Sequence, residues 1–480
     1  MRKLLPLLGG ALGLVFLLPS CTTQELLEPQ VSGQWLAGDH HIHSRYSVAW
    51  DREVDPPTPI FDNSLSPIQT NAQMAKRYGL AWMVSTDHGG RLHAKLYLEQ
   101  AYPDVLESRR AVPDVIQFFG FELNTPGADH ASVIVPQTHD EADRVYQLES
   151  QFDKIGADPD DLGANKVGRM IKALEVMRDF PAPPVVIANH PSRSARDEGE
   201  IYGKTVPEDL RAWNNVAPEV AVGMAGAPGH QAAAINADGS IGPRGSRGYY
   251  WGQPTYGGFD RLTAELGGFW DSMLGEGRRW WITANSDSHR NWMDGGIDFW
   301  PGEYSKTYVY AGRDHNAILA ALRAGRVFVT TGDLLSELYV TVATEAGNTA
   351  AVGGTLRLRS GEIATVTIRL RDPGGENSHG DAPAVNRVDL IAGDSAGTQA
   401  GANPNRNPST RIIRRFGAGD WTREGEFLTM TERLQDIDRD IYLRVRGTSG
   451  KELEPDPDPP GENPWRDLWF YSNPVFVQVE

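Results

Sequence analysis

The sequence predicts an α/β domain followed by an antiparallel β-sandwich. From Trp35 to about Thr331, short apolar runs of β type alternate with helical stretches, and this alternation predicts a largely parallel sheet or barrel. After Leu335 the runs alternate with a period of two between Gly, Pro and Asn turns, which is typical of a β-sandwich. The chain has 480 residues, 40% hydrophobic and 23% charged, so its length and composition suit two or more globular domains.

The first domain is expected to span residues 35–334. Buried strands are predicted in apolar runs that each end in polar residues: LAWMVSTDH, VIQFFGFELN, ASVIVP, PVVIANHP and WWITANSDSH. Helices are predicted over residues 67–79 and 163–180, and again just before Gly325, which is placed to end a helix. The stretch from Trp213 to Gly258 is rich in Gly, Pro, Tyr and Trp and has little periodicity, so we expect a loop that faces the substrate.

The second domain is expected to span residues 335–480. Its strands are predicted in alternating runs: ELYVTV, TLRLRS, TVTIRLRD, RVDLIAG, IYLRVRG and PVFVQVE. Helical signals nearly vanish here, and the proline-rich segment EPDPDPPGENP is expected to be a surface loop.

The N-terminus has the pattern of a targeting segment. Two basic residues precede the apolar run LLPLLGGALGLVFLL, which is short for a membrane span, and LPSC then ends at Cys21, the single cysteine of the chain. This resembles a bacterial lipobox, so residues 1–20 are expected to be a lipoprotein signal peptide and residues 21–34 a tether. Acylated Cys21 would anchor the protein in the cell envelope, on the periplasmic face or in the outer membrane, as Thr22 suggests by resemblance to bacterial sorting rules. The alternative is an ordinary cleaved secretory signal with a buried cysteine.

The net charge of the chain indicates which kinds of molecule it can bind. The net charge of −17 argues against a nucleic-acid polymer, because binding a phosphate backbone needs clustered Lys and Arg. A locally cationic metal site can still accept a small anion, so we expect a small-molecule partner.

Two residue pairs have the spacing of metal ligands on strands. Side chains two apart on a strand share a face, so His41 and His43 in HHIHS can grip one ion while His40 points away. The same spacing recurs in SDSH, where Asp287 and His289 follow the run WWITAN.

Further candidate ligands lie at or near the ends of other predicted strands. His88 ends STDH, His190 follows VVIAN, and the turn NTPGAD brings His130 back to face Glu122 across a hairpin. One such histidine alone is as readily a capped loop residue or a core histidine, but repetition at several strand ends favours a site, since ligands gather there in α/β folds. Imidazole mixed with carboxylate suits Zn, Mn or Fe.

These motifs resemble those of a known family. GDHHIHS, STDH, GFELN with ADH, ANHP and NSDSH, in this order, resemble the PHP (polymerase and histidinol phosphatase) superfamily of metal-dependent hydrolases over roughly residues 36–331. The region TYVYAGRDHNAILAALRAGRVFVTTGD and the β domain ending in SNPVFVQVE are similar to the secreted CehA/McbA branch. The resemblance implies a distorted (β/α)7 barrel with metals at the C-terminal ends of its strands.

The resemblance also implies a ligand set for two ions. One ion would be held by His41, His43, Glu122 and Asp287. Glu122 would bridge to a second ion, which His130 and His190 also hold.

For a third ion, this sequence departs from the family pattern at one ligand position. His88 and His289 would hold it, but Val48 stands where many relatives have an aspartate, and Asp51 is the substitute candidate. The centre is therefore expected to carry two or three divalent ions.

The expected activity is hydrolysis by a hydroxide that bridges the ions, with His88 or His289 assisting the leaving group. No GxSxG elbow suggests a serine nucleophile. A phosphomonoester or phosphodiester is the preferred substrate, and Arg193 in NHPSR is a candidate contact for its anionic group. The alternatives are a carboxylic or carbamate ester hydrolase of the CehA/McbA type and a non-catalytic binding lipoprotein.

The remaining acidic and histidine residues near the motifs receive lesser roles. Asp39 and Asp87 are expected to accept hydrogen bonds from ligand histidines. Surface or loop roles are expected for His230, His315 and His379, and no ligand role is expected for His93 and His139, although both closely follow motif residues.

Overall fold

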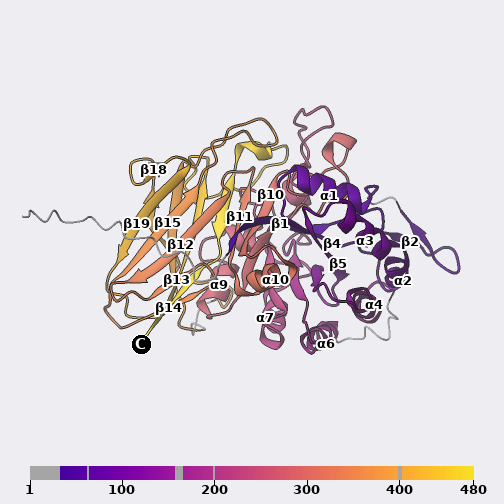
Figure 1. Cartoon of the computed structure of the whole chain (residues 1–480), viewed down its shortest axis with the longest axis horizontal. Helices are drawn as coiled ribbons and strands as arrows, with labels where there is room; N and C mark the ends of the chain where they lie inside the picture. The colour runs from indigo at the N-terminus through magenta and orange to yellow at the C-terminus, as the bar shows by residue number, and fades with distance from the viewer. Residues whose placement is uncertain (1–32, 62–63, 157–165, 198–199, 398–402) are drawn as a thin grey trace, which may run out of the picture.

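The computed structural model describes residues 33–61, 64–156, 166–197, 200–397 and 403–480 (Figure 1). The expected signal peptide, Cys21 and all of the tether before residue 33 lie outside these residues. The N-terminal part of the described chain forms an α/β region at one end of the molecule, and the C-terminal strands, orange to yellow in Figure 1, form the other end.

One large mixed sheet holds the strands of the α/β region. In spatial order they are β10 (Ser305–Ala311), β1 (Gln34–Ile42), β4 (Trp82–Ser85), β5 (Ile116–Asn124), β6 (His130–Val135), β7 (Val185–Asn189), β8 (Ala221–Ala227) and β9 (Trp281–Ala284). The pairs β1–β4, β4–β5, β7–β8 and β8–β9 are parallel. The expected hairpin makes β6 antiparallel to both β5 and β7, so the sheet is mixed rather than largely parallel.

The two ends of this run of strands lie together. The Thr307 hydroxyl on β10 accepts a hydrogen bond from the Ala284 amide at 2.7 Å and donates one to the Ala284 carbonyl at 2.6 Å. Ser305 donates to the carbonyl of Asn285 at 2.8 Å. Side chains of β10 thus reach the backbone of β9, and the sheet curls strongly.

His40 spans the inside of the curled sheet. From β1, its ring nitrogens lie 3.2 Å from Ser132 Oγ on β6 and 2.8 Å from Thr283 Oγ1 on β9. These three strands are not sheet neighbours, so the contacts require the sheet to wrap around the imidazole. His40 points away from His41 and His43, as strand alternation predicts.

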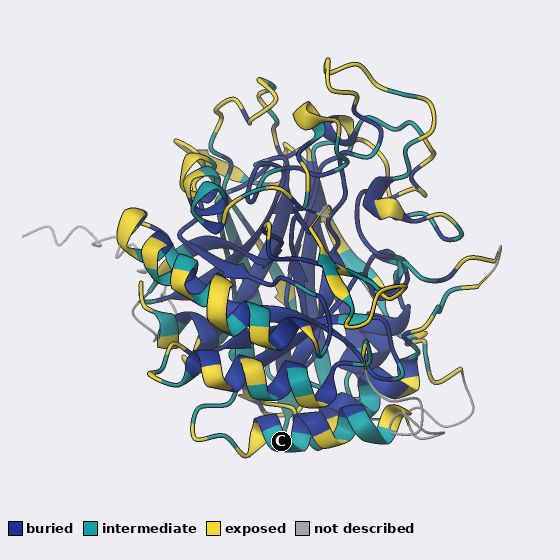
Figure 2. Ribbon diagram, turned by 90° about the vertical axis from the view of Figure 1, so that its right-hand side faces the viewer, coloured by how far each residue is buried: buried dark blue, intermediate teal, exposed yellow. Residues whose placement is uncertain are grey.

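Helices lie outside the sheet (Figures 1 and 2). They are α1 (Ile68–Arg77), α2 (His93–Leu96), α3 (Tyr102–Ala111), α4 (Glu141–Phe152), α6 (Lys166–Arg178), α7 (Pro207–Val216), α8 (Arg261–Ala264), α9 (Phe269–Gly275) and α10 (His315–Ala324). Short turns of 3-10 or π helix are η1 (Tyr97–Ala101), η2 (Arg247–Tyr249), η3 (Trp292–Asp294) and η4 (Pro464–Arg466). The expected helices correspond to α1, α6 and α10, and Gly325 ends α10 with φ +68°.

One strand departs from the sequence expectation. The stretch from Trp213 to Gly258 was expected to be irregular, yet β8 lies within it and all seven of its residues are buried. Its sequence, AVGMAGA, lacks the β-branched pattern by which buried strands are recognised. Small residues are needed because a Cβ on Gly223 would lie 2.0 Å from the Trp281 carbonyl oxygen on β9.

The C-terminal strands form a second group of sheets. A five-stranded antiparallel sheet has the order β13 (Thr349–Ala351), β12 (Glu337–Thr344), β15 (Ala364–Arg371), β19 (Phe427–Leu434) and β18 (Thr422–Glu424). The other C-terminal strands are β14 (Thr355–Leu358), β16 (Arg387–Asp394), β17 (Arg411–Phe416), β20 (Ile441–Thr448), β21 (Trp469–Ser472) and β22 (Val475–Val479). β14 pairs with β22 in parallel, so this region is not antiparallel throughout.

The large sheet runs without a break from the α/β region into the C-terminal region. β21 pairs with β11 (Val327–Thr331), which in turn pairs with β10. Alternate residues of β12 and β15 are buried against residues of β16, β20 and β22 in one hydrophobic core. The expected surface loop at residues 454–464 is partly buried, because Asp458 is 4% exposed and contacts the Gly-rich stretch.

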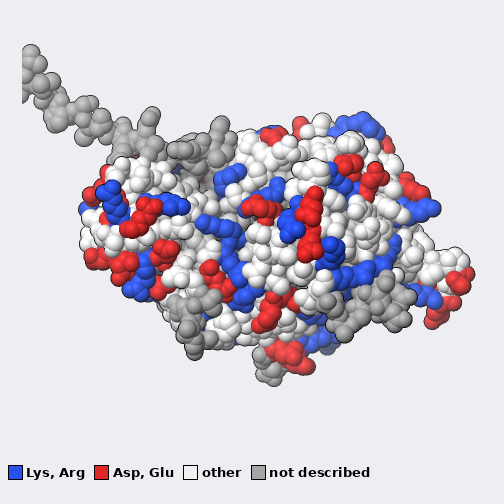
Figure 3. All heavy atoms as spheres, turned by 90° about the horizontal axis from the view of Figure 1, so that it is seen from below, with Lys and Arg blue, Asp and Glu red and all other residues white. Residues whose placement is uncertain are grey.

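A small hairpin and the outer surface complete the description. The hairpin pairs β2 (Ala49–Asp51) with β3 (Thr58–Ile60). The face in Figure 3 carries Lys and Arg interspersed with Asp and Glu. Among the described residues, no helix is long and apolar enough to cross a membrane.

Candidate metal centre

Two groups of buried donors share one carboxylate. His41, His43 and Glu122 form one group, and Glu122, His130 and His190 form the other; within each group, ligand atoms lie within 4.8 Å of one another. The donors come from β1, β5, β6 and the segment after β7, which are brought together by the curled sheet. These groups could hold metal ions.

The pair predicted from strand alternation faces two carboxylates. His41 Nε2 lies 3.0 Å from Glu122 Oε1 and 3.2 Å from Asp287 Oδ1. His43 Nε2 lies 3.1 Å from the same Asp287 oxygen and 2.9 Å from His41 Nε2. Both side chains are fully buried, so the four donors converge away from bulk water.

Glu122 lies between the two groups. Its Oε1 is 3.1 Å from His130 Nδ1 and 3.5 Å from His190 Nε2, and it accepts a hydrogen bond from Asn189 Nδ2 at 3.0 Å. Its Oε2 faces His43 Nε2 at 3.6 Å. The β5–β6 register pairs Asn124 with His130, which places Glu122 and His130 on one face of the hairpin as expected.

Asp287 joins the first group from the loop after β9. The His43 amide donates to the Ser288 carbonyl at 2.9 Å, which fixes this loop beside the end of β1. Asp287 Oδ2 accepts a hydrogen bond from Arg193 Nη1 at 2.8 Å. Arg193, expected to contact substrate, thus lies at the centre itself, with Nη2 2.5 Å from His190 Nε2.

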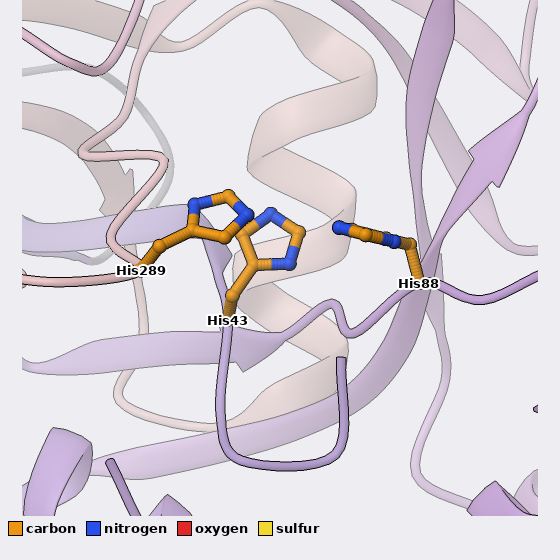
Figure 4. A group of neighbouring side chains, drawn as sticks. All are labelled: His43, His88 and His289. Carbon is orange, nitrogen blue, oxygen red and sulfur yellow. The ribbon is translucent and has the colours of Figure 1, made fainter. Parts of the chain in front are cut away.

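A third group of donors consists of His43, His88 and His289 (Figure 4). The His43 ring lies between the other two, 3.8 Å from the His289 centroid and 5.0 Å from the His88 centroid. His289 Nδ1 is 2.9 Å from the Asp287 carbonyl oxygen, which leaves Nε2 as the nitrogen with the free lone pair.

Val48 lies beside the third group of donors, whereas Asp51 lies in the β2–β3 hairpin. Val48 is buried, and its amide donates to the carbonyl of His88 at 2.9 Å. Asp51 lies in the β2–β3 hairpin, where its carboxylate accepts the Glu53 amide at 2.9 Å. Among the described residues, Asp51 belongs to none of the groups of donors within reach of one ion.

Burial and charge shift the protonation of these donors. Burial alone would raise the pKa of Glu122 and of Asp287, but the neighbouring histidine and arginine charges outweigh it and hold both pKa values well below normal. Burial lowers the pKa of His88 to about 3. Burial, followed by the charge of His289, lowers the pKa of His43 well below normal. The two carboxylates are thus ionised and His43 and His88 neutral, which are the forms that bind metal.

Asp39 and Asp87, which lie beside the donors, hydrogen-bond to backbone amides and hydroxyls rather than to imidazole rings. Asp39 accepts the backbone amides of His41 and Ser286 at 3.0 and 3.1 Å, not an imidazole. Asp87 accepts the Ser47 hydroxyl at 2.8 Å, and Ser47 Oγ lies 2.9 Å from His43 Nδ1, so Asp87 orients His43 through a serine. The expectation of direct carboxylate–imidazole bonds was wrong because these carboxylates are saturated by strand-end amides and hydroxyls.

Asp129 was not anticipated. Its carboxylate lies 3.6 Å from His190 Nδ1 and 3.8 Å from His130 Nε2. Burial alone would raise the pKa of Asp129, but the hydrogen bond with His190 and the charge of His130 bring it below normal. The sequence offers a hint of this role in GADH, where Asp129 directly precedes the candidate ligand His130.

His230 lies in the loop after β8, and a loop position was expected, but the side chain is buried beside the donors rather than at the surface. It is 8% exposed, with Nε2 3.0 Å from Asp287 Oδ2, and its Nδ1 is paired with Asp298. It follows β8 as His190 follows β7, so recognising AVGMAGA as a strand would have singled it out.

The other histidines lie apart from the donors. His93 is buried, with Nδ1 2.6 Å from Glu149 Oε1 and Nε2 2.8 Å from the Tyr46 carbonyl. His315 begins α10 against Phe118, and His379 stacks on Trp465. His139 is exposed before α4.

The donor set fits a divalent metal. His130 Nδ1, which faces Glu122 Oε1 at 3.1 Å, is buried and has no aligned hydrogen-bond partner. Unsatisfied buried nitrogens are costly unless another ligand compensates. Imidazoles mixed with carboxylates suit Zn, Mn or Fe better than Ca or Mg.

The centre is partly open to solvent. His41 and His43 are fully buried, whereas the side chains of His130 and Arg193 are 26% and 16% exposed. Tyr249 and Trp251, both exposed, continue from His230: the Tyr249 ring is 6.0 Å from His230 and 5.2 Å from Trp251. A substrate would approach over these partly exposed groups.

Comparison with family models and with curated proteins finds no match for this chain. Among solved structures, the crystal structure of PsfC from Pseudomonas syringae PB-5123 aligns with 58% of this chain and 83% of that chain. The sequence identity is 16% and the TM-score is 0.30, and a likeness at this level carries no argument about fold or function.

Proposed function

We propose that this protein is a metal-dependent hydrolase of the PHP type and that its substrate is a small phosphate ester. The observation that carries the proposal is the position of Glu122, whose Oε1 faces His41, His130 and His190 at 3.0, 3.1 and 3.5 Å. One carboxylate shared by two sets of imidazoles is the arrangement of a two-ion hydrolytic centre.

The assignment of residues follows the two donor groups. His41, His43, Glu122 and Asp287 would hold one ion, and Glu122, His130 and His190 a second. When bound, such ions lower the pKa of a water and polarise the oxygen of the substrate. Zn, Mn and Fe are the candidate metals.

Arg193 supports an anionic substrate. Its guanidinium is held by Asp287 where the centre is partly open to solvent, so its remaining donors can orient a phosphate oxygen. His88, which follows β4, or His289, two residues after Asp287, would manage the proton of the leaving oxygen when it holds no ion. No Ser or Cys nucleophile is part of the proposal.

The proposal includes a closed barrel of the (β/α)7 type and location at the cell envelope. The contacts of Thr307 with Ala284 and of His40 with Thr283 support closure of the sheet. The envelope location depends on Cys21, which lies outside the described residues.

The test combines metal analysis with paired chromogenic substrates: a phosphomonoester, a phosphodiester, and an aryl carboxylate or carbamate ester. We expect the purified protein to contain a divalent transition metal and to turn over a phosphate ester. Turnover of only the carboxylic or carbamate ester would show that the substrate is not a phosphate ester. Bound metal without turnover of any ester would favour a binding protein.

Glu122→Gln is the decisive variant. The neutral amide cannot bridge two ions, so metal content and activity should fall together, each by at least about tenfold. Glu149→Gln is the matched control, because Glu149 is also a buried glutamate beside a histidine but lies outside the donor groups. Full metal content and rate in Glu122→Gln would contradict the proposal.

A further inference from the structure

His230 is held in place from several directions. Its amide donates to the Ser286 carbonyl at 3.3 Å, and its own carbonyl accepts the Gly248 amide at 3.1 Å. The preceding Gly229 allows close approach, since a Cβ there would lie 2.1 Å from Asp287 Cβ. His230 has φ +58°, and Asp287 and His190 also have positive φ, of +46° and +30°. Strain of this kind persists only where the surroundings enforce it, and it gathers at functional sites.

The ring of His230 has the orientation of a metal ligand. Its Nδ1 is paired with Asp298 Oδ1, and Asp298 is 2% exposed. The other oxygen of Asp298 is occupied, because it accepts the amides of His289 and Arg290 at 2.7 and 2.9 Å. An ionised carboxylate only accepts, so Nδ1 carries a hydrogen, and Nε2 is the nitrogen at which a metal ion would replace a second hydrogen. Histidines that bind metals usually donate their other ring hydrogen to such a carboxylate.

The other ring nitrogen of His230, Nε2, points toward the metal-ligand candidates. His230 Nε2 is 3.0 Å from Asp287 Oδ2, on the side of the carboxylate opposite to His41 and His43, which face Oδ1. The His289 ring centroid is 5.6 Å from that of His230. A nitrogen lone pair and a carboxylate oxygen at this distance repel unless a proton or a metal cation lies between them.

The residue at position 48 supplies no ligand atom to the centre. Val48 replaces the aspartate that the resemblance leads one to expect, and its buried side chain offers no ligand atom. The group of His88 and His289 therefore lacks a carboxylate from the first motif. His230 adds a nitrogen beside His289 from an unrelated part of the chain.

We propose that His230 is a metal ligand, holding a divalent transition ion together with Asp287 and His289. Asp298 orients it and is not a ligand itself, because both of its oxygens are engaged. The inference rests on the proposed function only in assuming a metal centre at Glu122 and Asp287.

The test measures metal binding directly rather than activity. The protein is stripped with a chelator, reconstituted with Zn²⁺ or Mn²⁺, and analysed by elemental mass spectrometry and calorimetric titration. We expect His230→Ala to lose one ion per chain or to bind its weakest ion at least about tenfold less tightly than wild type. His315→Ala is the control, a half-buried histidine outside the donor groups, and should match wild type.

A second variant guards against a folding defect. His230→Gln can still donate to Asp298 and fills more of the space, and it should show the same loss with an unchanged circular dichroism spectrum. Reconstitution with Co²⁺ gives a further readout, because loss of a nitrogen ligand alters the visible absorption of the bound ion.

The outcomes separate this inference from the proposed function. Unchanged ion number and affinity in both His230 variants, with ions lost in Glu122→Gln, would overturn the role of His230 and leave the two-ion centre intact. Metal bound through His230 without ester turnover would support the ligand role and overturn the hydrolase. A wild-type protein that takes up no ion would overturn both.

Discussion

The partners of each imidazole decide what that imidazole can do. His40 has both ring nitrogens bonded, to Ser132 and Thr283, so no lone pair remains for a metal and its role is to tie three strands together. His41 on the same strand and His43, directly after its end, turn Nε2 toward carboxylates instead. Strand alternation separates these roles, and the tertiary neighbours of each face define them.

Asp153 gives a pH test that is independent of the metal centre. It accepts the Asn124 amide at 2.9 Å and the Ile155 amide at 2.8 Å, and burial, with the charge of Glu149 second, raises its pKa from 3.8 to about 7. Between those values the folded state binds more protons than the unfolded state, so stability falls as the pH rises through this window. Above pH 7 the effect of this group is constant.

Asp153→Asn should therefore remove part of the pH dependence. Relative to the variant, the free energy of unfolding of wild type should fall from pH 4 to pH 7 by at most about 1.4 kcal/mol per pH unit. Urea denaturation at four pH values measures the difference. Asp143→Asn, at an exposed position on α4, is the control, and parallel stability curves for wild type and Asp153→Asn would show the assignment to be wrong.

At the scale of elements, the strand ends position the centre. β1 ends one residue before His43, Glu122 lies two residues before the end of β5, and β9 ends three residues before Asp287. The β5–β6 hairpin turns His130 back onto Glu122. Because the carboxyl ends of parallel strands meet on one edge, short motifs far apart in sequence reach one point. β8 follows the same rule with His230, although its sequence does not look like that of a strand.

Gly223→Ala tests the tight packing of β8 on β9. The added Cβ would lie 2.0 Å from a backbone oxygen, which no side-chain movement relieves, so we expect a loss of at least about 2 kcal/mol in the free energy of unfolding. Gly375→Ala is the matched control, since nothing lies within 4 Å of its Cβ position, and its stability should change by less than about 0.5 kcal/mol. Equal denaturation midpoints for the two variants would contradict the packing argument.

At the scale of the whole molecule, the C-terminal region supports the segment that carries His230. Asp458 accepts hydrogen bonds from Thr255 Oγ1 at 2.6 Å and from the amides of Gly257 and Gly258 at 2.7 and 2.9 Å. Arg247, 1% exposed, bonds to Gln231 Oε1 and lies 3.6 Å from Asp458 Oδ1. The stretch next to the candidate metal centre is thus clamped by a loop that lies 200 or more residues further along the chain.

Asp458→Ala should loosen that clamp. Loss of three hydrogen bonds to a buried carboxylate should cost about 2 to 4 kcal/mol and expose residues 236–258 to proteases. Limited proteolysis followed by mass spectrometry would locate faster cleavage there. Asp456→Ala, at an exposed position in the same loop, should be cleaved at the wild-type rate, and equal rates for both variants would rule out the clamp.

The periodicity of the sequence predicted about half of the strands and the helices α1, α6 and α10, because those elements bury regular apolar faces. It missed β8, where close backbone approach selects Gly and Ala and removes the usual signal. It also assigned wrong partners to Asp39 and Asp87, because hydrogen bonds between segments distant in sequence depend on how the strand ends meet.

The sequence by itself determined the residue types and their spacing: histidines two apart on a strand, carboxylates after apolar runs, and a valine at position 48. Periodicity and ligand chemistry are local, so those features can be recognised without a fold. Only the tertiary structure decided that Glu122 lies between two sets of imidazoles, that Asp51 lies elsewhere, and that His230 lies 3.0 Å from Asp287. Such distances depend on how the sheet curls and how the C-terminal region packs, which are properties of the whole chain.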